Sequence, residues 1–193
     1  MLELNLVGSY KMNVHIDKQM CLARNILRWL RKKIDEEAII AGGAPRDWTL
    51  NSCAKDIDIY YRSHLRKGNM IDIIREFPCA IIKDYPFNYN FGFIDFIINC
   101  EFNDLKFQFI KIKENTLLPC EFIINNFDFD ICRVWDNGYA IHETQEFKND
   151  ISKKLLTLRP DRICGEQLKH SLINHYPRLQ DKFPDHQFRV VAG

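Results

Sequence analysis

Two aspartates one residue apart, Asp56 and Asp58, have the types and the spacing to bind hard divalent cations. The segment from Lys55 to Tyr61 alternates polar and apolar residues, which predicts a β-strand with both carboxylates on one face. Their Cα atoms would then lie about 6.5 to 7 Å apart. Mg²⁺ prefers carboxylate and phosphate oxygens, and two such ions can stabilise the attacking and leaving oxygens of an in-line displacement. Taken alone, however, an Asp-x-Asp pair is more often a solvent-exposed strand face.

The segment before Asp56 and Asp58 favours the metal-binding interpretation over a solvent-exposed strand face. Residues 38–41 are apolar, which predicts a buried strand that ends at Gly42-Gly43, and Pro45 can begin a short helix. Asn51 stands where that helix would end and suits a left-handed backbone conformation. Glycines without Cβ let backbone N–H groups approach phosphates, and a helix N-terminus favours anions. A phosphate-binding turn beside a metal-binding pair predicts a nucleotide site.

This part of the chain resembles the G-G-x-V-R-D-x-L-L-G-x4-D-x-D-I signature of tRNA CCA-adding enzymes and bacterial poly(A) polymerases, members of the DNA polymerase beta-like nucleotidyltransferase superfamily. The matching residues are Gly42-Gly43-Ala44-Pro45-Arg46-Asp47, then Leu50-Asn51, then Asp56-Ile57-Asp58-Ile59, and every spacing agrees. A second segment, Asn126 to Ile131, is similar to the strand that brings a further carboxylate toward the first two in that family. The resemblance spans residues 36–136.

The resemblance implies a role for each matching residue. Gly42 and Gly43 would hold the triphosphate of a nucleoside triphosphate (NTP), and Asp56 and Asp58 would bind Mg²⁺, in a two-ion site, as catalytic residues. Asp128 would be the third catalytic acid. Arg46 and Asp47 would orient the site or contact the substrate, and with Lys55 they complete the expected nucleotide-binding set. The implied reaction is attack of a hydroxyl on the α-phosphate with release of pyrophosphate.

Two acids compete for the third place in the metal site, so the predicted metal set is Asp56, Asp58, Asp128 and Asp130. Asp128 and Asp130 lie two apart on a predicted strand and would face the same way, but only one can lie level with the first pair. The resemblance favours Asp128, because Asp130 falls where the motif has a neutral threonine. Asp130 is then expected to hold a ligand or a basic side chain such as Lys55 or Arg133.

Some residues depart from the family's pattern. Pro45 replaces an aliphatic residue and Asn51 a glycine, both of which the predicted turn and helix tolerate. Asn126-Phe127 stands where CCA-adding enzymes have an Arg-Arg pair, and no Glu-Asp-x-x-Arg element for the selection of CTP and ATP is present. The sequence therefore predicts the catalytic part of the family without its specificity elements.

The remaining pattern predicts an α+β fold, a small mixed or antiparallel sheet flanked by helices, with a short C-terminal helical extension. We expect a catalytic domain at residues 1–145 and a helical extension at 146–193 packed on it. Helices are predicted at 17–36, with Asp17 as N-cap, at 69–77, and beyond 146 with a break at Pro177. Strands are predicted near 91–99 and 105–112, reversed at Asn103-Asp104, then at 127–132 and 139–142, and irregular structure from Asp185.

Composition sets limits on the partners. The 193 residues have a net charge of +1, which excludes the strong basicity of many nucleic-acid-binding proteins, and no apolar run approaches the length needed to span a membrane. Seven widely spaced cysteines without a Cys-x2-Cys pair indicate reduced thiols rather than disulfides or structural zinc, and His170-x4-His175 is a weak ligand spacing. A cytoplasmic location is expected.

These observations predict an enzyme that transfers a nucleoside monophosphate from an NTP to a hydroxyl, either the 3′ end of a tRNA-like RNA or a protein side chain. Two alternatives remain open at this stage. One is a non-catalytic module that binds nucleotide or RNA, and the other is an antitoxin-like small nucleotidyltransferase that acts on a protein partner. The oligomeric state is not predicted.

Overall fold

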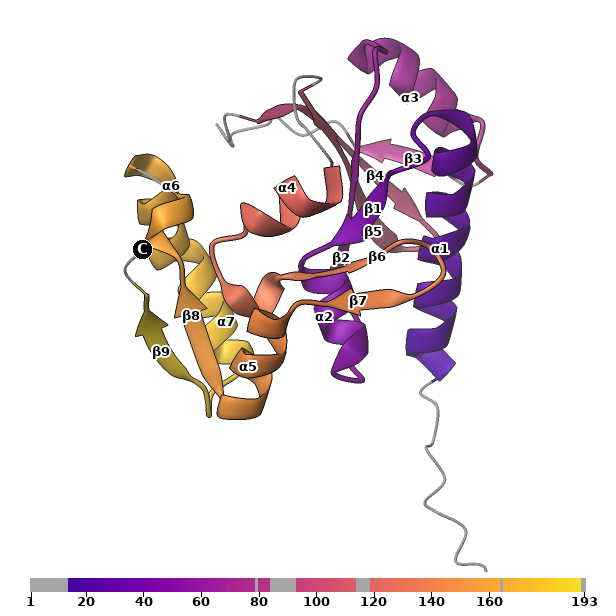
Figure 1. Ribbon diagram of the computed structural model, residues 1–193. Coiled ribbons are helices and arrows are strands. Elements are labelled where there is room, and N and C mark those ends of the chain that lie inside the picture. The colour runs from indigo at the N-terminus through magenta and orange to yellow at the C-terminus, as the bar shows by residue number, and fades with distance from the viewer. Residues whose placement is uncertain (1–13, 79, 84–92, 114–118, 164, 192–193) are drawn as a thin grey trace, which may run out of the picture.

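The computed structural model describes residues 14–78, 80–83, 93–113, 119–163 and 165–191 (Figure 1). A seven-stranded sheet runs through it in the order β3-β4-β5-β2-β1-β6-β7. Its strands are β1 (Ile39–Ala41), β2 (Asp56–Tyr61), β3 (Ala80–Lys83), β4 (Ile94–Phe102), β5 (Leu105–Ile112), β6 (Val134–Asp136) and β7 (Ile141–Glu143). Among these strands β2 and β5 run parallel, and the other neighbours run antiparallel. The predicted α+β class is confirmed, and β2 lies at the centre of the sheet.

Helices cover both faces of this sheet (Figure 1). Helices α1 (Val14–Lys33) and α3 (Lys67–Arg75) pack on the face that buries Ile57, Ile59 and Tyr61. Helix α4 (Pro119–Asn125) packs on the opposite face, together with Tyr60. The alternation predicted for β2 is therefore confirmed, because its odd-numbered residues enter one core and Tyr60 enters the other.

Helix α1 positions the beginning of β2. Its buried residues recur at the spacing of one helix face, from Ile16 to Leu30. Buried Gln19 on this face accepts hydrogen bonds from Trp48 Nε1 (2.7 Å) and Ala54 N (2.8 Å) and donates one to Ala54 O (2.9 Å). The expected N-cap at Asp17 is wrong, because the helix already includes Val14 and Asp17 lies in its first turn.

The short elements around the glycine pair follow the prediction closely. Helix α2 (Gly43–Thr49) begins two residues before Pro45, the expected first residue, and Asn51 takes the expected left-handed conformation at φ 55°. The β4–β5 hairpin turns at Asn103 and Asp104, whose positive φ values of 47° and 65° are those of a two-residue turn.

The strand predicted at 127–132 is wrong. Asp130–Cys132 forms a 3-10 turn, and a single bridge from Phe129 to Leu158 precedes it. The alternation arises because Phe129 and Ile131 enter a third core with Phe147, Leu156 and Leu158. The hydrogen bond from Cys132 N to Phe129 O (3.0 Å) belongs to this turn.

The C-terminal segment differs from its prediction in three places. Helix α5 (Gln145–Lys153) ends at Lys154, which has a left-handed φ of 52°, and β8 (Leu155–Leu158) follows. The end expected to be irregular instead forms β9 (Gln187–Val190), parallel to β8. Between them α6 (Gly165–His170), a π-helical turn (Ser171–His175) and α7 (Tyr176–Lys182) follow one another. The π-helical turn accommodates Pro177, so the expected break is absent.

The third core joins the two predicted domains. It contains Phe129 and Val134 from the proposed catalytic domain and Leu156, Ile163 and Leu179 from the proposed extension. The boundary at residue 145 remains a prediction, although the extension is not purely helical. Within the described residues, no helix is both long and apolar enough to cross a membrane.

Candidate active site

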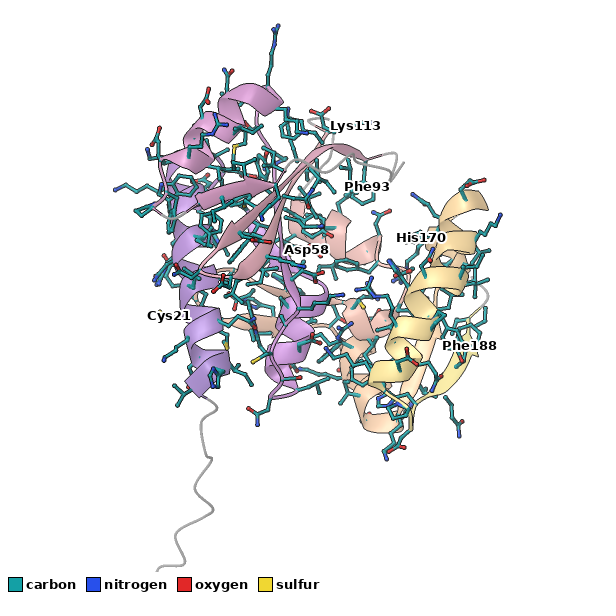
Figure 2. All side chains as sticks on the ribbon, turned by 180° about the vertical axis from the view of Figure 1, so that it is seen from behind. Cys21, Asp58, Phe93, Lys113, His170 and Phe188 are labelled. Carbon is teal, nitrogen blue, oxygen red and sulfur yellow. The ribbon has the colours of Figure 1, made fainter. Side chains whose placement is uncertain are left out.

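A cavity of about 530 Å³ lies between the sheet and the C-terminal helices. Its walls come from the turn after β1, from β2, from α4 and from residues 171–182. In the view from behind, Asp58 lies in the sheet, and the helix that carries His170 lies beside the sheet (Figure 2). The cavity therefore lies between segments that are more than 100 residues apart in the sequence.

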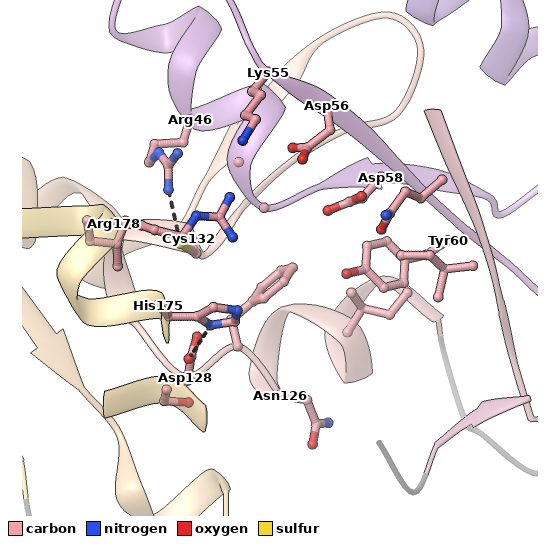
Figure 3. Close-up of a pocket in the computed structure, with 18 of the residues that line it drawn as sticks. Arg46, Lys55, Asp56, Asp58, Tyr60, Asn126, Asp128, Cys132, His175 and Arg178 are labelled. Atoms are coloured by element: carbon pink, nitrogen blue, oxygen red, sulfur yellow. Dashed lines mark hydrogen bonds and ion pairs between the residues drawn. The ribbon is translucent and has the colours of Figure 1, made fainter. Parts of the chain in front are cut away.

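Asp56 and Asp58 point into this cavity from β2, as predicted (Figure 3). Neither carboxylate has a hydrogen bond or ion pair with another described residue, and the buried Oδ1 of Asp58 has no hydrogen-bond partner there. Burial, and next the charge of Asp56, raise the pKa of Asp58 to about 7, while Arg178 lowers it. Two unpaired carboxylates this close are unfavourable unless a cation neutralises them.

The pair fits a hard divalent cation. A shielded carboxylate oxygen without a donor offers the kind of ligand that Mg²⁺ takes, and phosphate and water oxygens complete its coordination in nucleotide sites. Among the described residues no further acid, histidine or cysteine joins the pair to make a group of three. Within the described site, Asp56 and Asp58 are thus the residues that could hold such a cation.

The two glycines differ in what they require. Gly42 has φ 86°, and a Cβ there would lie 3.2 Å from the Phe127 ring. The Gly42 N–H group donates to Val134 O (3.1 Å), so Gly42 shapes the turn. Gly43 has no left-handed φ, and the nearest atom to an added Cβ would be the Arg46 guanidinium at 3.6 Å. Gly43 therefore leaves space at the cavity wall that a side chain would fill.

Arg46 and Asp47 line the cavity but are buried in contacts with the protein. Arg46 donates to Asp47 Oδ1 (2.8 Å) and to Cys132 Sγ (3.3 Å), and its guanidinium lies over the Phe183 ring. The second Asp47 oxygen pairs with Lys182 on α7. The expected nucleotide-binding pair thus joins α2 to α7 and positions the opposite wall.

Asp128 lines the cavity beside His175 rather than beside Asp56 and Asp58 (Figure 3). His175 Nδ1 donates to Asp128 Oδ2 (2.7 Å), and Phe129 N donates to Oδ1 (3.0 Å). Burial raises the pKa of Asp128, but the hydrogen bond and charge of His175, with further hydrogen bonds from Ser171 and Phe129, hold it below its usual value. Asp128 is therefore an ionised partner of His175.

Asp130 does not line the cavity, and the expectation that it shares a strand face with Asp128 is wrong. Its buried carboxylate accepts from Arg159 Nε (3.0 Å) and lies 3.7 Å from Arg133 and 3.8 Å from Arg162. The expectation that Asp130 holds a basic side chain such as Arg133 agrees with these contacts.

The sequence reasoning missed the wall formed by the C-terminal helices. Its polar cavity-lining residues are Ser171, His175, Arg178, Asp181 and Lys182. Four of these follow the i, i+4, i+7, i+11 spacing of a helix face, which was the available signal. The two histidines considered as ligands lie with ring centroids 4.7 Å apart, and the described residues around them form no metal-binding group of three.

No family model matches the chain, and no curated protein matches it in sequence. Among solved structures, a CCA-adding enzyme in complex with ATP aligns with a TM-score of 0.60 at 14% identity, over 93% of this chain and 42% of that chain. The chain shares its fold with CCA-adding enzymes. The Bacillus stearothermophilus CCA-adding enzyme in complex with CTP aligns with a TM-score of 0.53 at 17% identity, over 86% and 38%.

This likeness to CCA-adding enzymes concerns the fold. A tRNA-processing enzyme in its apo form also aligns, with a TM-score of 0.52 at 16% identity, over 79% of this chain and 38% of that chain. The chain spans about two fifths of the length of these structures. Because the alignment covers 93% of this chain, it must include part of segment 146–193. The similarity therefore extends beyond the motif region.

Proposed function

We propose that this protein is a metal-dependent nucleotidyltransferase, which transfers a nucleoside monophosphate from an NTP to a hydroxyl acceptor and releases pyrophosphate. The observation that carries the proposal is the pair of unpartnered carboxylates, Asp56 and Asp58, at the wall of a cavity of about 530 Å³. That volume suits a bound small molecule. The fold is shared with enzymes whose structures contain ATP or CTP, which supports the same ligand class here.

The proposed reaction forms a bond between the acceptor oxygen and the α-phosphorus and breaks the bond from that phosphorus to the bridging oxygen of pyrophosphate, while the proton of the acceptor hydroxyl passes to solvent. Asp56 and Asp58 would hold Mg²⁺, which supplies positive charge to the phosphate oxygens as negative charge develops. Gly43 would leave room for the triphosphate to approach the backbone, and the exposed Lys55 would add a charge at the cavity wall. Such chemistry depends on positioning and charge more than on a covalent residue.

The proposed reaction requires an acceptor with a free hydroxyl group. RNA 3′ ends and protein hydroxyls both have the required oxygen. One of the solved structures with this fold is a tRNA-processing enzyme, which makes an RNA 3′ end the first acceptor to test.

The test is incubation of the purified chain with each α-³²P-labelled NTP, Mg²⁺, and either bulk RNA or bulk protein. We expect label to enter one acceptor class, with an equal amount of pyrophosphate released. Binding of NTP without label in either acceptor would instead indicate a non-catalytic module. Label in protein alone would favour the antitoxin-like alternative.

A further inference from the structure

Helix α7 brings to the cavity an arginine, Arg178, that has no partner in the described part of the chain. Arg178 is exposed and lines the cavity, and its side chain extends toward the side of β2 (Figure 3). Within the described residues it forms no hydrogen bond or ion pair.

The basic residues that line the cavity differ in whether they have an ion-pair partner in the protein. Arg46 and Lys182 both form ion pairs with Asp47, so both side chains already have a partner in the protein. Lys55 and Arg178 have no such partner among the described residues. They come from opposite walls, Lys55 from the position just before β2 and Arg178 from α7 (Figure 3).

Among the described residues that line the cavity, three carboxylates (Asp56, Asp58 and Asp181) and two cations (Lys55 and Arg178) are unpaired, and they do not pair with one another. This pattern is complementary to a metal-bound polyphosphate, in which the cation faces the acids and the anionic oxygens face Lys55 and Arg178. A guanidinium is suited to the second role, because its planar donors can bind two oxygens of one phosphate.

We propose that Arg178 binds the polyphosphate of the NTP, at the part that leaves as pyrophosphate, so that α7 belongs to the active site. This inference rests on the proposed function. A phosphate of an RNA acceptor would offer the same chemistry, but the Arg178 side chain extends toward the side of β2, where Asp56 and Asp58 lie, and this favours the phosphates that share the metal site (Figure 3).

The backbone of α7 is fixed on both sides of this residue. Leu179 is buried in the third core, and His175 is held by Asp128. Lys182 pairs with Asp47, and the Phe183 ring lies 5.5 Å from the Arg46 guanidinium. Arg178 can therefore meet a ligand with its backbone already positioned, which lowers the entropic cost of binding.

The experiment measures binding of inorganic tripolyphosphate, with Mg²⁺, to the full chain by calorimetry. The variants are Arg178→Gln and Arg178→Lys, with Arg189→Gln on exposed β9 as a control that removes the same charge. We expect Arg178→Gln to bind about 10- to 100-fold more weakly, the scale of hydrogen bonds to charged groups. Arg178→Lys should lie between Arg178→Gln and the wild type, and Arg189→Gln should match the wild type. Unfolding temperatures without ligand should agree, since Arg178 has no described protein partner.

Three results would overturn the inference. The first is unchanged tripolyphosphate binding in Arg178→Gln, and the second is equal weakening in Arg178→Gln and Arg189→Gln. The third is that Arg178→Gln weakens binding of a short RNA, measured without NTP, but does not weaken binding of tripolyphosphate. Failure of the proposed function would look different. In that case the wild type would bind tripolyphosphate through Arg178 but transfer no nucleotide to any acceptor.

Discussion

At the scale of single residues, Asp58 is a cavity-lining acid whose pKa is raised to about 7 by burial and by the charge of Asp56. Its carboxyl group is placed beside Asp56, and one of its oxygens is shielded without a donor. A structural aspartate would be given a hydrogen bond or a basic partner, as Asp128 and Asp130 are. The described residues therefore give this pair no hydrogen-bond or ion-pair partner, and a bound cation would supply the missing positive charge.

The raised pKa of Asp58 predicts a pH-dependent stability in metal-free protein. An acid whose folded pKa is about 7 contributes stability that is full below its unfolded pKa, near 4, and is lost as pH rises through 7. Asp58→Asn has no such group. In EDTA, the melting temperature of Asp58→Asn should rise relative to that of the wild type as the pH increases from 5 to 8. A constant difference across this range would contradict the assignment.

The arginine contacts of Asp130 predict an effect on stability rather than on catalysis. Asp130 and Arg133 are both buried, and removal of one partner of a buried ion pair costs about 3–5 kcal/mol. Asp130→Asn should lower the free energy of unfolding by roughly that amount, measured by urea titration. Asp72→Asn, which breaks the exposed pair with Arg75, should cost at most about 1 kcal/mol. A loss of transfer rate in stable Asp130→Asn would show a catalytic role instead.

At the scale of elements, the two glycines of the turn between β1 and α2 have different predicted roles, Gly42 in the fold and Gly43 in ligand binding. Gly42→Ala should destabilise the fold by about 1–2 kcal/mol or more, because a side chain at φ 86° is strained and also meets Phe127. Gly43→Val should fold normally, since its Cβ meets ordinary space.

The effect of Gly43→Val should instead be on ligand binding. NTP with Mg²⁺ should raise the melting temperature of the wild type by mass action, and the variant should lose most of this rise because its side chain fills the approach to the backbone. An equal rise in Gly43→Val would exclude the turn from the nucleotide site.

Local patterns predicted the elements whose partners lie close in sequence. The periodicity of α1, the alternation of β2 and the turn at Asn103-Asp104 each reflect one face or one turn, so the residues themselves carry the signal. Leu155–Leu158 resembled a continued helix because its spacing follows Ile151 by four and seven residues. Its real partner, β9, lies about 30 residues further on, and no local pattern records it.

At the scale of the whole molecule, the site is formed by two distant segments. The motif from Gly42 to Asp58 identified one wall, because glycine and paired aspartates are rare enough together to be informative. The opposite wall, with His175 and Arg178, could not be placed from sequence, since its position depends on the third core and on the Lys182–Asp47 pair. The same core explains why Asp128 faces His175.

The central claim is that Asp56 and Asp58 hold the metal for nucleotide transfer. The most direct measurement is the single-turnover rate of transfer at saturating Mg²⁺ for Asp56→Ala, Asp58→Ala and the exposed control Asp72→Ala, each shown by melting to be folded. We expect both site variants to lose about 1,000-fold or more in rate, because several kcal/mol of charge stabilisation is removed, and to melt no lower than the wild type. The control should keep the wild-type rate. Transfer at a near wild-type rate by folded Asp56→Ala or Asp58→Ala would contradict the account.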